Sequence, residues 1–110
     1  MHWIITKDLM PIGDISHVGK GNLPSDLKEK LKFADGVLTR HALIGDFRKT
    51  LNFEFRLFDD DGELYYEGKC GDLDKADQER AFEPLDWAMN DSGCTRMDYR
   101  KVGEREWKTL

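Results

Sequence analysis

Two runs of alternating apolar residues on either side of an acidic turn constrain the fold of this chain most. Leucine or phenylalanine occupies every second position from 51 to 57, and apolar or small side chains return with the same period in residues 64–70. The turn between them ends in Gly62, and glycine adopts positive φ at no steric cost. Alternation with period two is typical of a strand that buries one face, so the sequence predicts a β-hairpin over residues 51–70 with Gly62 at positive φ.

Two registers compete within this hairpin. A type I turn followed by a glycine bulge pairs Asp59 with Glu63 and places Phe58 opposite Leu64. The apolar pattern instead favours Leu57 opposite Leu64 across a two-residue loop. Because a slip of one residue would expose a whole row of apolar side chains, we expect the register that follows the apolar pattern.

The remaining segments predict one α+β domain over residues 1–110, with an antiparallel sheet of about four or five strands built from hairpins and one main helix on one face. Breakers dominate residues 7–24, which we expect to be a loop with at most one short strand near 15–18. The other expected elements are a strand over 2–6 with Trp3 and Ile5 on one face, a helix over 25–33 that Ser25 caps, a helical turn within 74–81 and a second hairpin over 95–110. Residues 37–44 are compatible with an extension of the helix, but their β-branched side chains favour a strand.

The main helix is expected over residues 84–92. Pro84 suits the first helical position, where no backbone N–H is needed, and Gly93 can end the helix in the left-handed conformation. The expected buried side chains are Leu85, Ala88 and Met89 from this helix, and Met97, Tyr99 and Trp107 from the second hairpin.

Composition excludes several classes of protein. The net charge of −5 disfavours nucleic-acid binding through phosphate contacts. We find no apolar run of membrane-spanning length and no secretory signal, so we expect a cytoplasmic protein that does not bind membranes. Cys70 and Cys94 are then expected to be buried reduced thiols, although a disulfide between two strand cysteines stays open.

Two motif-like segments fail as ligand sites. If Gly62 were the sixth residue of a calcium loop, Leu57 would stand at the first ligand position, where an oxygen is required. Residues 13–21 resemble a phosphate-binding loop, but the glycines are one residue too far apart, and Gly21 stands where serine or threonine binds magnesium. We therefore predict no metal, no cofactor and no catalytic residue.

The histidines leave one enzymatic alternative open. His2, His17 and His41 are scattered, and no motif ties a serine or cysteine to any of them. Catalytic groups assemble from distant segments, so a small-ligand or hydrolytic pocket between helix and sheet would require one histidine to meet Asp86 or Asp98.

Charge is distributed unevenly along the chain. Residues 59–91 contain twelve acidic and three basic side chains, a net charge of −9, whereas the segments before and after carry +2 each. A field of one sign steers oppositely charged partners. We therefore expect a non-catalytic domain that binds another protein, with self-association through a sheet edge or the Phe58 and Tyr65 face as a further alternative. The expected partner-binding residues are Asp72, Asp74, Asp77, Glu79 and the aromatics Phe58 and Tyr65.

The C-terminal half also carries a resemblance. Its segments are residues 55–68 (Phe-Arg-Leu-Phe-Asp-Asp-Asp-Gly-Glu-Leu-Tyr-Tyr-Glu-Gly), 82–89 (Phe-Glu-Pro-Leu-Asp-Trp-Ala-Met), Gly-Cys-Thr at 93–95, Tyr-Arg at 99–100 and Trp-Lys-Thr-Leu at 107–110. Together they resemble a group of small bacterial accessory proteins, some of them carried by phages or mobile elements. The resemblance implies a compact accessory domain and no known reaction, so it assigns no role to any residue.

Overall fold

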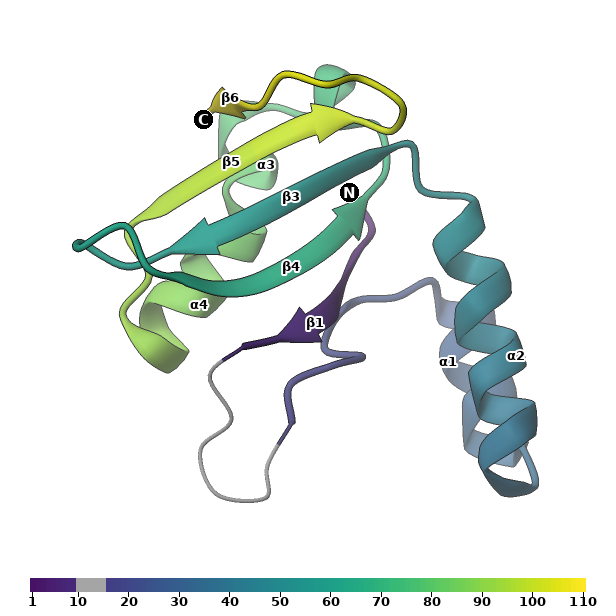
Figure 1. The fold of residues 1–110 in the computed structure, drawn as a ribbon. Helices are drawn as coiled ribbons and strands as arrows, with labels where there is room; N and C mark the ends of the chain where they lie inside the picture. The colour runs from purple at the N-terminus through teal and green to yellow at the C-terminus, as the bar shows by residue number, and fades with distance from the viewer. Residues whose placement is uncertain (10–15) are drawn as a thin grey trace.

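A computed structural model describes residues 1–9 and 16–110, and in it one antiparallel sheet organises the chain (Figure 1). The strand order is β2-β1-β4-β3-β5-β6, so the central β3–β4 hairpin lies between strands from the two ends of the chain. The α+β class is as predicted, but the six strands and four α-helices of the described residues exceed the expected four or five strands and one main helix. The elements are β1 (Trp3–Asp8), β2 (Gly21–Asn22), α1 (Ser25–Phe33), α2 (Gly36–Lys49), β3 (Phe53–Phe58), β4 (Leu64–Cys70), the 3-10 turn η1 (Leu73–Lys75), α3 (Gln78–Ala81), α4 (Glu83–Ser92), β5 (Arg96–Lys101) and β6 (Lys108–Thr109).

The β3–β4 hairpin has the turn of the first expected register but departs from both registers beyond it. The turn closes with the Gly62 N–H donating to the Asp59 carbonyl, and Gly62 has the predicted positive φ, +79°. Phe58 pairs with Leu64, as the turn chemistry requires, but a β-bulge then shifts the pairing so that Leu57 lies opposite Tyr66. The register that we expected from the apolar pattern is therefore wrong. The bulge puts both rows of apolar side chains on one face without changing the turn.

The main core lies between this face of the sheet and the layer of η1, α3 and α4 (Figure 1). Trp3 and Ile5 point into it, as alternation along β1 predicts. From α4, Leu85 and Ala88 are buried as expected. Met89 is half-exposed, so the prediction that it is buried is wrong. The other buried members are Phe53, Phe55, Leu57, Tyr66, Cys70, Leu73, Ala81, Cys94 and Met97.

The expected ends of α4 are confirmed. Pro84 lies in its first turn, and Gly93 ends it with φ +76°. The expected helical turn within 74–81 is split between η1 and α3, because Asp77 takes an extended conformation between them and caps α3 by accepting a hydrogen bond from the Arg80 N–H.

The opposite face of the sheet is polar, and no helix of the described residues covers its centre (Figure 1). Arg56 and Arg100 lie over the Trp107 ring, 3.8 and 4.2 Å from its centroid. The Arg100 Nε donates to a Glu54 oxygen at 2.6 Å. We expected Trp107 to point into the main core, and this prediction is wrong. Its ring packs against two arginines on the other face of the sheet. Tyr99, in contrast, packs against the main core as expected.

The structure differs from the sequence-based expectations in the first half of the chain. The structure shows no strand at residues 16–18 of the expected 15–18 strand, and residue 15 lies outside the described residues; the short strand is instead β2. α1 has the predicted bounds, although Pro24 rather than Ser25 is its cap and no side chain makes a capping bond. The strand expected over 37–44 is wrong, because these residues belong to α2.

Both cysteines are free and completely buried in the main core. Burial raises the pKa of the Cys70 thiol to about 12 and that of the Cys94 thiol to about 11. The structure therefore favours the reduced, unreactive thiols that we expected rather than a disulfide.

Candidate functional site

The α1–α2 helical hairpin stands apart from the main core and is the first candidate site. Figure 1 shows the two helices side by side, projecting away from the sheet. Gly36, with φ +78°, lies at the junction where the chain reverses between them. A second, small cluster of buried residues holds the base of the hairpin to the sheet: Ile4, Leu27, Phe47 and Leu51.

α2 buries very little of its own apolar surface. Phe47 is its only buried residue, and Leu43 and Ile44 are partly buried against the small cluster. On the side of the helix opposite Phe47, Leu38 is 84% exposed, and Val37, at the start of the helix, is 66% exposed. Ala42 is also exposed, four residues after Leu38 and so on the same side of the helix. We call Leu38, His41, Ala42 and the half-buried Gly45 the outer face of α2.

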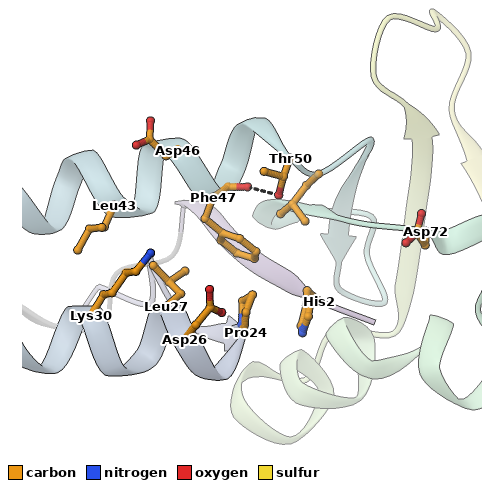
Figure 2. Close-up of a pocket in the computed structure, with 11 residues that line it drawn as sticks. His2, Pro24, Asp26, Leu27, Lys30, Leu43, Asp46, Phe47, Thr50 and Asp72 are labelled. Carbon is orange, nitrogen blue, oxygen red and sulfur yellow. Dashed lines mark hydrogen bonds between the residues drawn. The ribbon is translucent and has the colours of Figure 1, made fainter.

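A pocket of about 460 Å³ opens between the hairpin and the body of the domain (Figure 2). Leu27, Phe47 and Leu51 give it apolar walls. The rings of His2 and Phe47 meet edge to face, with centroids 6.4 Å apart. Polar side chains surround the apolar walls: Asp26, Lys30, Asp46, Thr50 and Asp72.

The position of Phe47 in this pocket follows from the end of α2. The Thr50 hydroxyl donates to the Phe47 carbonyl at 2.7 Å, shown dashed in Figure 2, and the Thr50 N–H donates to the same carbonyl at 3.0 Å. These bonds satisfy a carbonyl that the last turn of a helix leaves free. The two Thr50 hydrogen bonds hold the last turn of α2, from which the Phe47 side chain packs in the same cluster as Leu27 of α1.

The second candidate site is a polar cluster around His17. Its Nδ1 lies 3.0 Å from an Asp8 oxygen, and its Nε2 lies 3.1 Å from an Asp91 oxygen. The Asp8 side chain is only 2% exposed. The Tyr66 hydroxyl hydrogen-bonds to Asp91 and Ser92, and burial raises its pKa to about 12. The cluster thus joins β1, β4, the end of α4 and the segment that follows the undescribed residues.

This cluster is better suited to holding segments together than to catalysis. A neutral imidazole donates from one ring nitrogen only, so both His17 contacts are hydrogen bonds only when the ring or one carboxyl carries an additional proton. Ser92 hydrogen-bonds to Asp91 and Tyr66 rather than to His17, so this serine is not paired with the imidazole as a nucleophile.

The enzymatic alternative required a histidine to meet Asp86 or Asp98, and the structure brings His17 to Asp8 and Asp91 instead. Neither contact could be found from the sequence, because no motif links these three residues. His2 lies at the pocket of Figure 2, and His41 belongs to the outer face of α2.

The aromatics expected at a docking surface are largely covered. Phe58 is only 8% exposed, and the Arg96 guanidinium lies 4.1 Å from its ring centroid. It is therefore not the exposed aromatic that we expected. Tyr65 is half-buried at the bulge and packs against the main core.

The four expected acidic residues are all exposed, but they differ in their other roles. Asp77 caps α3 and also lies 3.7 Å from Arg80. Asp72 has φ +52°, and its N–H donates to Asn52. Asp74 and Glu79 have neither role, so they are the better residues for testing the acidic surface.

No group of three or more histidine, cysteine or acidic side chains within residues 1–9 and 16–110 could hold a metal ion. The described helices include none that could cross a membrane. Comparison of the chain with protein-family models, with curated proteins and with solved structures finds no match. The resemblance of the C-terminal half to small bacterial accessory proteins therefore stays a prediction.

Proposed function

We propose that this chain is a non-catalytic domain that binds another protein through the outer face of α2. The observation that carries the proposal is the exposure of Leu38 at 84%, beside Val37 at 66%, on a helix that already packs its other side. Contiguous exposed apolar surface of this kind is typical of protein interaction sites.

The composition of α2 supports the proposal. The apolar residues of this helix lie on more than one side instead of forming one stripe, so packing against the sheet and α1 leaves some of them exposed. Burying a leucine or valine side chain contributes roughly 1.5–3 kcal/mol. A partner that covered Leu38 and Val37 would therefore gain free energy that the isolated domain leaves unused.

The acidic segment has a supporting role in this proposal. Asp72, Asp74, Asp77 and Glu79 are exposed in the segment of η1 and α3, whereas residues 25–50, which include the α1–α2 hairpin, carry six basic and four acidic side chains. A domain with separate acidic and basic regions orients a charged partner before contact, so association should slow as salt rises. Placement in the cytoplasm remains part of the proposal.

The test is affinity capture from the native host with wild-type protein and the Leu38→Glu variant. We expect Leu38→Glu to lose a partner that wild-type protein retains, because a charge would be buried in the interface. Val102→Glu is the matched control, since Val102 is also exposed but lies in the β5–β6 turn. Equal recovery of the partner by wild-type protein and Leu38→Glu would contradict the proposed surface.

The pocket of Figure 2 favours a second candidate function, the binding of a small molecule. Its volume of about 460 Å³ lies within the range of small-ligand sites. Its apolar walls and its three aspartates, Asp26, Asp46 and Asp72, against one lysine, Lys30, favour a ligand with an apolar body and a positive charge. Phenethylammonium is a suitable probe: NMR shifts confined to His2, Phe47 and their neighbours would support this function, and unchanged spectra at millimolar probe would contradict it.

A further inference from the structure

We infer that the outer face of α2 binds a second copy of this chain, and that the two α2 helices pack antiparallel about a two-fold axis beside Ala42. The inference rests on the proposed function and names the partner of the same surface. Within the described residues, α1 is the only helix beside α2 (Figure 1). A second copy supplies an apolar helix face of matching length, which an isologous interface requires.

Gly45 provides an observation that the isolated domain does not explain. It lies in the interior of α2, where glycine is less favourable than alanine. A Cβ built at Gly45 has no atom within 4 Å, and its φ is not positive. Neither packing within the domain nor backbone geometry therefore requires glycine here. A helix from another molecule that approaches closely at Gly45 would require it.

The antiparallel arrangement follows from the spacing along α2. Leu38 and Gly45 lie on the same side of the helix, four residues before and three residues after Ala42. With a two-fold axis beside Ala42, Leu38 of each copy lies next to Gly45 of the other. The large exposed side chain thus meets the position that lacks one, as helix packing favours.

Charges at the ends of α2 complement one another in the same arrangement. Asp35 precedes the helix and Lys49 ends it, seven residues on either side of Ala42, and both are exposed. Asp35 makes no capping hydrogen bond that would occupy its carboxylate. Antiparallel packing places Asp35 of each copy beside Lys49 of the other, whereas parallel packing would place like charges together.

The size of the surface predicts a weak dimer. Fourteen residues give a helix of about 21 Å, which is less than a standard interface of roughly 800 Å² per partner needs. We therefore expect reversible association with a dissociation constant in the micromolar range, on the order of 10 to 100 µM.

Sedimentation over about 1 µM to 1 mM tests this directly. The average mass of wild-type protein should rise from 12.8 kDa toward twice that value, and Leu38→Glu should raise the dissociation constant at least about 100-fold. Val102→Glu should dimerise like wild-type protein. A wild-type chain that stays monomeric at 1 mM, or a Leu38→Glu variant that dimerises equally well, would overturn the inference.

Charge reversal tests the antiparallel arrangement. Asp35→Lys and Lys49→Asp should each weaken self-association about 3- to 10-fold, because each places like charges together at both ends of the interface. An equimolar mixture of the two variants should associate at least as well as wild-type protein, since both contacts then join opposite charges. No recovery in the mixture would overturn the arrangement.

Cross-linking tests the two-fold axis. Ala42→Cys should form a covalent dimer with a short bismaleimide, whereas Lys28→Cys, an exposed position on α1, should not. The native thiols are buried and should not contribute. Equal cross-linking at both positions would overturn the axis. A monomeric wild-type chain whose capture of a host protein is lost in Leu38→Glu would refute only the dimer and leave the proposed function intact.

Discussion

At the scale of single residues, the centre of the sheet depends on a glycine. The Phe55 ring and the Ile4 carbonyl lie so close to Gly68 that a Cβ there would be 2.2 Å from a Phe55 ring carbon and 2.5 Å from the Ile4 oxygen. Alternation along β4 predicts that Gly68, two residues after Tyr66, lies on the buried face. The sequence does not indicate that the Phe55 ring occupies the space beside it.

Gly68→Ala should therefore destabilise the domain by about 1–3 kcal/mol or more, since the methyl group has no free space. The free energy of unfolding in urea measures the effect. Gly71→Ala is the matched control, because a Cβ at Gly71 makes only an ordinary 3.4 Å contact with Leu51. Similar stabilities for the two variants would show that Phe55 moves away at little cost.

Tyr66 predicts how stability depends on alkaline pH. Burial raises its pKa to about 12, above the value of 10.0 for a free phenol, so the folded state favours the neutral hydroxyl. This contribution is fully present below pH 10 and is lost as the pH rises toward 12. Urea midpoints between pH 9 and 11.5 should fall more steeply for wild-type protein than for Tyr66→Phe. Parallel pH profiles would show that Tyr66 ionises without cost.

At the scale of elements, α2 shows where sequence analysis failed. The β-branched residues Val37 and Ile44 suggested a strand over residues 37–44, with extension of the preceding helix as the alternative. In the structure Gly36 lies at the reversal between two helices, and Leu43 and Phe47, one turn apart, pack against the base of the hairpin. Periodicity did not reveal this helix, because its apolar residues lie on more than one side.

Gly45→Ala tests whether glycine at this position of α2 serves the dimer or the fold of the single domain. In the Leu38→Glu background, where we expect a monomer, the substitution should stabilise the domain by about 0.5–1 kcal/mol, because alanine is the better helix former and has free space. In the Leu38 background it should raise the dissociation constant of the dimer. A loss of stability in the monomeric background would show that Gly45 serves the fold itself.

The β3–β4 hairpin was predicted more accurately, since its two strands and the positive φ of Gly62 are as expected. Its register was not, because turn chemistry and burial imposed different pairings. The bulge at Tyr65 allows both, and a single sequence gives no signal for where a bulge is placed.

At the scale of the whole molecule, the candidate sites depend on long-range contacts that the sequence does not announce. His17 meets Asp91 from the other end of the chain, and the pocket of Figure 2 forms between segments that include His2 and Asp72. The uneven charge could be counted from the sequence, whereas the exposure of the outer face of α2 required the hairpin to be placed first.

Removing β6 should alter the behaviour of the entire domain. β5 has six residues, and β6 pairs with its outer edge at Asp98 and Tyr99. Deletion of residues 107–110 would expose that edge and also uncover Arg56 and Arg100. We expect time-dependent light scattering and thioflavin fluorescence in the truncated protein, and neither in full-length Trp107→Phe. A clear, monodisperse truncated protein would contradict this expectation.

Within the described residues, both margins of the sheet are strands only two residues long, β2 and β6. An incoming extended chain finds few free backbone groups on such short strands, so we expect further strands to be added poorly. Growth into cross-β fibres is therefore disfavoured. If the inferred pair of α2 helices forms, its two-fold axis limits the assembly to two copies.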